Sequence, residues 1–267
     1  MKRVRLDVEL VEQGYCATQA DAARCVMAGL VSSCGERFST PGTQVIPGLK
    51  LHVKDKKPYV SRGGVKLAGG LDAFNVNPFG LCCLDVGCSS GGFTDCLLKR
   101  GAKSVLSVDV GRAQFDWSLR NDSRVTLLES TNIVDVPSMG YFHTAQLAVC
   151  DVSFTNIERI LPATLDVLTM DGRFLTLVKP QFEAHPSQVG DGGIVRDKNV
   201  QRATLVNVVH LFAECGLYPV DVCLSPIKGH KGNREFLLLG DRKRMSCTSK
   251  EQLGLHLDKL LQKIGNL

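Results

Sequence analysis

Short apolar runs alternate with helical segments over most of this sequence, and that alternation limits the possible folds more than any other feature. Five runs are apolar at nearly every position, as strands buried on both faces are: LCCLDVG, SVLSVDV, RVTLLE, AQLAVCDV and RFLTLVKP. Helical segments are expected over residues 93–100, 156–168 and 197–215. The pattern predicts an α/β domain with a mostly parallel, doubly wound sheet.

The end of the chain predicts a different strand pairing. The segment PVDVCLSPIKGHKGNREFLLLG holds two strand-like runs, which indicates an antiparallel, hairpin-like edge of the sheet. A last helix is expected over roughly residues 249–264, where leucines recur at helical spacing: Leu253, Leu257, Leu260 and Leu261.

The N-terminal part of the chain follows another pattern. Residues 6–30 predict two short helices that are broken around Gly14, with Thr18 as the cap of the second helix. A strand-like return at Leu30-Val31 and a loop rich in Gly, Pro and Thr follow, and a compact module ends near Val53.

The segment KDKKPYVSRGG separates the two parts. It is charged and contains Pro58 and a pair of glycines, so it predicts a linker. The expected organisation is a small α+β domain over residues 1–55, a linker over 56–64 and an α/β domain over 65–267.

Composition excludes some classes of protein. The eleven cysteines are scattered and none forms a C-x-x-C pair, so we expect small buried apolar residues in a reducing cytosol and no metal site. No segment approaches the ~20 apolar residues that span a bilayer, and the start MKRVRLDVEL lacks the apolar stretch of a signal peptide. We therefore expect a soluble, cytoplasmic monomer without a membrane partner. The net charge of +5 suits a polyanionic partner but does not require one.

A glycine-rich turn follows the first strand of the predicted sheet, over Asp85–Phe93 (DVGCSSGGF). Glycines let the backbone approach a ligand, and helix N-terminal amides can meet polar groups. The spacing G-x-x-x-G-G differs from the G-x-G-x-x-G of dinucleotide-binding folds, which argues against a dehydrogenase. Asp109 ends the next strand, where a carboxylate can accept hydrogen bonds from both ribose hydroxyls of an adenosine.

This combination predicts an S-adenosylmethionine site in which Asp85 shapes the loop near the methionine portion and Asp109 holds the ribose. For the glycines alone, a plain tight turn is the alternative. The candidate cofactor-binding residues are Asp85, Gly87, Cys88, Ser89, Gly91, Gly92, Phe93, Asp109, Val110, Asn132 and Asp151.

Four ionisable residues are candidates for catalysis. Lys179 and Asp151 each end an apolar run, and the carboxyl ends of parallel strands face the ligand crevice. Lys66 begins the helix after the linker, and Glu235 begins the final strand. Taken singly, each is open to interpretation as an ordinary surface or strand-end charge.

Methyl transfer to a hydroxyl needs in-line alignment and a group that takes the proton. Our hypothesis is that Lys179 is the base, that Lys66 is its neighbour near the attacking oxygen, and that Asp151 and Glu235 orient the two amines. A lysine can act as a base only if its usual pKa of ~10.4 is lowered, and burial beside a second lysine can lower it.

Eight motifs resemble those of a known family: RLDVELVEQG, VSRGGVKL, LDVGCSSGGFTDCLL, WSLRND, CDVSF, VKPQFE, QVGDGGIV and GNREF. Over residues 5–240 the chain is similar to the TlyA proteins, often labelled hemolysin A. The resemblance implies a Rossmann-like, FtsJ-type rRNA 2′-O-methyltransferase that uses S-adenosyl-L-methionine, with an N-terminal RNA-binding domain named after ribosomal protein S-four. It also implies a Lys-Asp-Lys-Glu tetrad at Lys66, Asp151, Lys179 and Glu235, and cytidine riboses of rRNA in ribosomes or ribosomal subunits as substrates.

Candidate RNA-binding residues are basic side chains in the small domain and the linker: Lys2, Arg3, Arg5, Arg24 and Arg62. Residues 1–60 carry nine basic and six acidic side chains, a net of +3. The family usually has basic residues where this chain has Ala17, Gln19 and Thr40, so we expect fewer phosphate contacts.

Two other functions stay open at this point. One is a ribosome-assembly factor that binds RNA and the cofactor without catalysis, and the intact tetrad argues against it. The other is a membrane-lytic hemolysin, which would need a long apolar or a basic amphipathic segment that the sequence lacks. The loop over residues 182–197 is either a lid over the RNA or cofactor, or an ordinary exposed loop.

Overall fold

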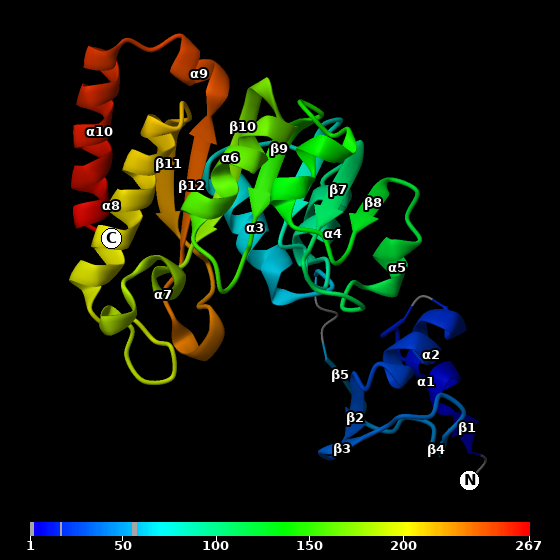
Figure 1. Cartoon of the computed structure of the whole chain (residues 1–267). Coiled ribbons are helices and arrows are strands. Elements are labelled where there is room, and N and C mark those ends of the chain that lie inside the picture. The colour runs from blue at the N-terminus through cyan, green and yellow to red at the C-terminus, as the bar shows by residue number, and fades with distance from the viewer. Residues whose placement is uncertain (1–2, 17, 55–57) are drawn as a thin grey trace. The chain divides into compact units, whose positions relative to one another are not determined.

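The computed structural model describes residues 3–16, 18–54 and 58–267, and the chain divides into two compact units, Met1–Lys57 and Pro58–Leu267 (Figure 1). The elements of the small unit are β1 (Val4–Arg5), α1 (Leu6–Glu12), α2 (Gln19–Met27), β2 (Val31–Ser33), β3 (Glu36–Arg37), β4 (Gln44–Val45) and β5 (His52–Val53). Strand β1 pairs with β4, and β3, β2 and β5 form a second sheet in that order.

The two predicted helices of the small unit are confirmed. The hydroxyl of Thr18 accepts a hydrogen bond from the amide of Asp21 at 3.1 Å, so Thr18 caps α2 as its position predicted. The segment after β2 is not one continuous loop, because β3, β4 and β5 lie within it. These strands are two residues long each, too short for an alternating pattern to reveal.

The large unit is built on one sheet in the order β11-β12-β10-β9-β6-β7-β8. Its strands are β6 (Cys82–Val86), β7 (Ser104–Val108), β8 (Val125–Leu128), β9 (Ala145–Cys150), β10 (Leu168–Val178), β11 (Tyr218–Leu224) and β12 (Phe236–Asp241). The five strands from β10 to β8 run parallel, and β12 is antiparallel to both of its neighbours. The predicted sheet and the antiparallel pair at its edge are confirmed.

Helices cover both faces of this sheet. They are α3 (Arg62–Ala73), α4 (Gly92–Lys99), α5 (Trp117–Arg120), α6 (Ile157–Val167), α7 (Pro180–Glu183), α8 (Lys198–Glu214), α9 (Arg242–Ser246) and α10 (Lys250–Gly265), with 3-10 turns at η1 (Ile133–Asp135), η2 (Pro137–Met139), η3 (Pro186–Gln188) and η4 (His230–Gly232). Leu147 and Val149 of β9 join the core under α3, α4 and α5, whereas Ala148 and Cys150 join the core under α6, α8 and α10. Burial on both faces explains why these strands are apolar at nearly every position.

Strand register brings the polar residues to one edge. Val86 of β6 lies opposite Val108 of β7 and Cys150 of β9, so the residues that follow these strands emerge together. Strand β12 runs the other way, and its first residue, Phe236, pairs with Val178, the last residue of β10. The segment that precedes β12 therefore lies at the same edge of the sheet as the segments that follow β6, β7, β9 and β10.

The linker ends earlier than residue 64. The amide of Val60 donates to Asp95 Oδ2 at 2.9 Å, and α3 already begins at Arg62, so residues 58–64 pack as part of the large unit. Gly64, one of the two glycines assigned to the linker, lies in the first turn of α3, and glycine is required there because an added Cβ would overlap the ring of Tyr59. The expectation of buried cysteines is wrong for Cys34 and Cys247, which are exposed.

Candidate active site

Lys66 reaches the sheet edge from α3. The helix packs closely on the sheet, since an added Cβ at Gly70 would lie 3.1 Å from the side chain of Leu237 in β12. The Nζ of Lys66 lies 2.5 Å from Glu235 Oε2, and the two residues are 7% and 2% exposed. The pair is thus almost completely removed from water. Gly229 faces this carboxylate so closely that any added Cβ would overlap Glu235.

Lys179 follows β10, and Asp151 follows the neighbouring strand β9. The Nζ of Lys179 lies 2.6 Å from Asp151 Oδ1 at an angle outside hydrogen-bond geometry, so this contact is mainly coulombic. The amine also donates to the carbonyl of Val152 at 2.8 Å and to Ser153 Oγ at 3.0 Å. Residues 151–153, which follow β9, therefore surround the amine of Lys179 at the edge of the sheet.

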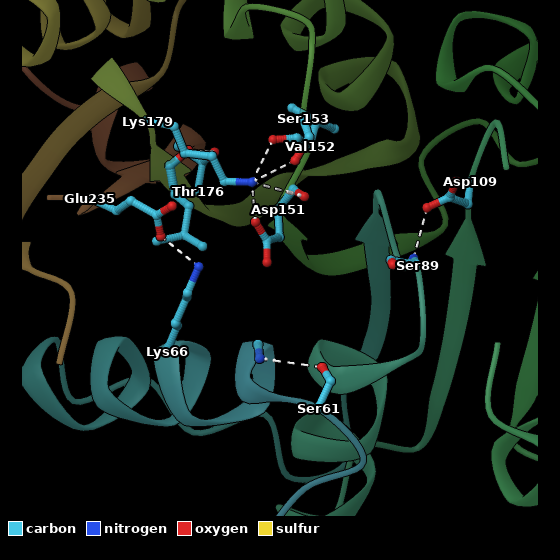
Figure 2. Close-up of polar contacts among 12 residues, drawn as sticks. Ser61, Lys66, Ser89, Asp109, Asp151, Val152, Ser153, Thr176, Lys179 and Glu235 are labelled. Carbon is cyan, nitrogen blue, oxygen red and sulfur yellow. Dashed lines mark hydrogen bonds and ion pairs between the residues drawn. The ribbon is translucent and has the colours of Figure 1, made fainter. Parts of the chain in front are cut away.

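Figure 2 shows that the four residues proposed for catalysis enter one space from different elements. Lys179 and Asp151 approach from the strand ends, and Lys66 approaches from the helix on one face of the sheet. Thr176 of β10, which is fully buried, lies beside Lys179 and Glu235 in the same view. The chain thus brings two amines and two carboxylates together, although they come from four separate segments.

A hollow adjoins this group and includes Asp151 in its wall. The other residues of its wall are Ser61, Gly63, Gly87, Cys88, Ser89, Ser90, Gly92 and Phe93. Gly87 has φ +80°, and an added Cβ would lie 3.1 Å from the backbone of Val152. Only glycine satisfies both constraints at this position. The N-termini of α3 and α4 meet here, since an added Cβ at Gly92 would overlap Ser61 Oγ.

A second, shallow hollow shares Cys88 and Ser89 with the first, and its wall also contains Asp109, Gly111, Arg112, Gln114, Phe115, Leu127 and Glu129. Asp109 accepts hydrogen bonds from the amides of Ser89 at 2.7 Å and Gly111 at 2.6 Å. Each carboxylate oxygen has two lone pairs, so Asp109 keeps the capacity to accept further hydrogen bonds from a ligand.

Asp85 lies beneath the glycine turn and lines neither hollow. It is fully buried, and its Oδ2 accepts a hydrogen bond from the hydroxyl of Thr94 at 2.6 Å. Its Oδ1 has no hydrogen-bond partner among the residues that the structure describes. Burial raises the pKa of Asp85 to about 7, against the opposing effect of the Thr94 hydrogen bond.

Glu183 is a partly buried acid that the sequence did not single out. It lies one helical turn after Lys179, and its Oε1 accepts a hydrogen bond from the amide of Ile157, the first residue of α6, at 3.1 Å. Burial raises the pKa of Glu183 to about 7. The contact anchors Ile157, at the far end of the segment that follows Asp151. Lys179 and Glu183, on either side of α7, therefore hold this segment at both of its ends.

Some predicted cofactor residues lie apart from the hollows. Val110 is 71% exposed, and Asn132 caps η1 by accepting a hydrogen bond from the amide of Val134 at 3.3 Å. Gly91 has φ +90° and packs against Leu119 and Phe115. None of Val110, Asn132 or Gly91 belongs to the walls of the two hollows.

The hollows also contain residues that sequence reasoning missed. Ser61 and Gly63 were assigned to the linker, although the motif VSRGG could have indicated a capped helix. Phe115, Leu127 and Glu129 belong to the second hollow. Glu129 ends the apolar run RVTLLE as Asp109 and Asp151 end theirs, and this position could have indicated it.

The predicted RNA-binding arginines differ in their surroundings. Arg5 forms an ion pair with Asp7 at 2.6 Å, and Arg24 forms one with Asp21 at 2.7 Å. Arg3 and Arg62 are exposed. Lys2 lies outside the described residues.

The loop over residues 182–197 is attached to the loop before β12. The side chain of Asn233 donates to the carbonyl of Gly193 at 2.8 Å, and its Oδ1 accepts from the amide of Val195 at 3.1 Å. Asn233 is 4% exposed, so these contacts are shielded from water. Among the helices over residues 3–16, 18–54 and 58–267, none has the length and apolarity to cross a membrane.

Comparison with known proteins identifies a family that matches this chain. Residues 59–242 match the model of the FtsJ-like methyltransferases. A Mycobacterium tuberculosis protein named 16S/23S rRNA (cytidine-2′-O)-methyltransferase TlyA is 40% identical over 239 residues, which cover 89% of each chain. A Brachyspira hyodysenteriae protein named Hemolysin A is 38% identical over 88% of this chain and 98% of its own.

Solved structures also resemble this chain over most or all of its length. A Streptococcus thermophilus protein with a hemolysin label matches with a TM-score of 0.67 and 36% identity over all of both chains. A Lactococcus lactis protein with the same label matches with a TM-score of 0.69 and 37% identity over 78% of this chain and 99% of that one.

Proposed function

We propose that this chain, which belongs to the FtsJ-like methyltransferase family, transfers the methyl group of S-adenosylmethionine to a ribose 2′-hydroxyl of ribosomal RNA. The observation that carries the proposal is that Lys179 Nζ lies 2.6 Å from Asp151, which is itself part of the wall of the hollow under the glycine turn. The name of the M. tuberculosis relative supports cytidine in the small- and large-subunit rRNAs as the target.

The residues of the two hollows fit S-adenosylmethionine. Ser61 and Gly63 at the N-terminus of α3, with the glycine turn, suit the amino-acid portion, because helix N-terminal amides favour a carboxylate. Asp109 suits the ribose hydroxyls, and Phe115 and Leu127 offer apolar contact for adenine. When bound, the cofactor supplies an electrophilic methyl group on its sulfonium.

The amine of Lys179 is the group that takes the hydroxyl proton. A neutral amine has two N–H bonds and one lone pair, and the carbonyl of Val152 and the hydroxyl oxygen of Ser153 lie 2.8 and 3.0 Å from Nζ as acceptors. With both N–H bonds directed to these oxygens, the lone pair is left for the 2′-hydroxyl. Lys66, held by Glu235, donates to the hydroxyl oxygen and fixes its position.

Substitution of Lys179 tests this mechanism. General base catalysis contributes about 10²–10⁴-fold, so we expect Lys179→Ala to lower kcat by that factor and to change the Kd for S-adenosylmethionine little. Lys179→Arg keeps a positive charge but cannot give up a proton, so it should be as inactive as Lys179→Ala. The measurement is tritium transfer from labelled cofactor to ribosomal subunits purified from cells without this gene.

The exposed Lys103 offers a matched control, and Lys103→Ala should transfer methyl groups at the wild-type rate. A Lys179→Ala variant with full activity would remove Lys179 from the mechanism. Wild-type protein that binds subunits without transferring any label would instead favour a non-catalytic assembly factor. Reverse transcription at limiting nucleotide then locates the modified ribose, because a 2′-O-methyl group stalls the polymerase.

A further inference from the structure

Two loops meet beside Glu235. One joins α7 to α8 and the other joins β11 to β12, and Figure 1 shows them side by side at the end of the sheet where α7 lies. Asn233 ties them together through its hydrogen bonds to Gly193 and Val195. The second loop also contains Gly229, whose backbone lies against the Glu235 carboxylate. The joined loops therefore border the catalytic group directly.

Three exposed cations lie on these loops: Arg196, Lys228 and Lys231. Lys231 donates to the carbonyl of Gly192 at 3.2 Å, and an added Cβ at Gly190 would lie 3.6 Å from the guanidinium of Arg196. Both side chains thus extend over the same glycine-rich segment. We call Arg196, Lys228 and Lys231 the cationic rim.

The charge of the cationic rim is not neutralised within the protein. Among the described residues, no carboxylate lies within ion-pair distance of its three side chains, whereas arginines elsewhere in the large unit pair at 2.6–2.7 Å, such as Arg100 with Asp72 and Arg120 with Glu129. Asp197, the nearest acid in sequence to Arg196, is engaged as the cap of α8. An uncompensated cationic surface beside a reaction site favours an anionic substrate.

We propose that the cationic rim binds the phosphates that flank the target ribose, an inference that rests on the proposed function. A ribose whose 2′-hydroxyl reaches Lys179 has a phosphate on each side, so a strand in this position must pass over the borders of the catalytic group. Lysine and arginine contacts to phosphate position a strand without selecting bases. The cationic rim therefore orients the RNA at the reaction site, and base choice comes from other contacts.

The test is the triple variant Arg196→Ala/Lys228→Ala/Lys231→Ala, with rRNA extracted from cells without this gene as the probe. Loss of three phosphate contacts should raise the KM for RNA by about tenfold or more near 0.15 M salt. It should also lower the slope of log affinity against log salt concentration by about 2. The kcat at saturating RNA and the Kd for S-adenosylmethionine should stay within about twofold of wild type, because no residue of the cationic rim touches the reacting atoms.

A charge-matched control removes three exposed lysines from α9 and α10, Lys243, Lys250 and Lys259. Equal effects in the two triple variants, or an unchanged KM and salt slope in the first, would overturn the proposal.

Direct RNA binding by filter retention separates this result from failure of the proposed function. Wild-type protein that binds RNA but transfers no methyl group to ribosomal subunits refutes the function, and the binding comparison still decides the role of the cationic rim. If the triple variant of the cationic rim lost binding to anionic lipid vesicles as strongly as it lost binding to RNA, a membrane surface would be the partner instead. That result would also overturn the proposal.

Discussion

At the scale of single residues, the Lys66–Glu235 pair carries a large desolvation cost. Its partners are 169 positions apart in sequence and almost completely buried. Removing two charges from water costs several kcal/mol per ion, and a close partner offsets that cost only while both are present. The pair is expected to serve the reaction more than stability.

Glu235→Leu should lower the free energy of unfolding by about 3–5 kcal/mol, because it leaves the Lys66 ammonium buried without a counter-charge. The double variant Lys66→Met/Glu235→Leu should recover most of that loss and remain inactive. Urea unfolding of Lys66→Met, Glu235→Leu and the double variant, with activity measured in parallel, gives the coupling energy. Additive losses in the double variant would contradict this account.

Asp85 makes stability depend on pH. Its pKa is about 7 in the folded protein and ~3.9 in an unfolded chain, so the unfolded state releases the proton first. Stability from this group is complete below about pH 4, falls by up to about 1.4 kcal/mol per pH unit as pH rises towards 7, and then stays low.

Asp85→Asn removes this titration and keeps an acceptor for Thr94. The free energy of unfolding of the variant minus that of wild type should therefore rise by about 2 kcal/mol between pH 5 and pH 7 and level off above pH 7. Urea unfolding at pH 5, 6, 7 and 8 measures this difference. A difference that does not change with pH would show that Asp85 is ionised throughout.

At the scale of elements, the close approach of α3 and α4 forms the hollow under the glycine turn. Their first turns contain glycines where helices usually avoid them, at Gly63, Gly64 and Gly92. An added Cβ at Gly64 or Gly92 would overlap a neighbouring side chain, but at Gly63 the nearest atoms would be Ser61 Oγ at 3.3 Å, Phe93 Cδ1 at 3.4 Å and Asp151 Oδ2 at 3.6 Å. A methyl group at Gly63 would therefore fit with a small shift of its neighbours, whereas one at Gly64 or Gly92 would not.

Gly63→Ala should change the free energy of unfolding by less than about 1 kcal/mol, since the helix preference of alanine opposes its close contacts with Ser61 and Phe93. Its methyl group would enter the hollow, so we expect the Kd for S-adenosylmethionine, measured by calorimetry, to rise about tenfold. Gly92→Ala, the comparison variant, should be destabilised by about 1–3 kcal/mol through overpacking. Wild-type affinity in Gly63→Ala would exclude this hollow as the site of the cofactor's amino-acid portion.

At the scale of the whole molecule, the two units have separate cores. One hydrophobic cluster contains only residues from the first unit, among them Leu6, Leu10 and Val26, and the two larger clusters contain only residues from the second. Each unit therefore buries its apolar surface by itself.

A chain of residues 58–267 should unfold cooperatively and bind S-adenosylmethionine with a Kd within about twofold of the full chain, because the cores of the large unit remain complete. Its affinity for rRNA should fall, since the basic residues of the small unit, Arg3 among them, are removed. Filter binding and tritium transfer with both chains test this expectation. Methylation of subunits by residues 58–267 at full efficiency would contradict an RNA-binding role for the small unit.

Local sequence patterns determined much of this protein. Strands buried on both faces must be apolar throughout, so five runs identified the sheet, and Asp151 and Lys179 were predicted at strand ends because strand ends are visible in sequence. The glycine turn after β6 was equally clear, since a positive φ at Gly87 leaves few other residues possible.

Only the tertiary structure decided which residues share a space. Lys66 and Glu235 became partners because α3 packs on the sheet through Gly70 and because β12 runs antiparallel to β10. Ser61 moved from a presumed linker into the wall of a hollow, and Asn132 remained outside it. The reason is physical: periodicity reports which side of one segment is buried, whereas contacts between distant segments depend on strand register and on how closely two backbones can approach.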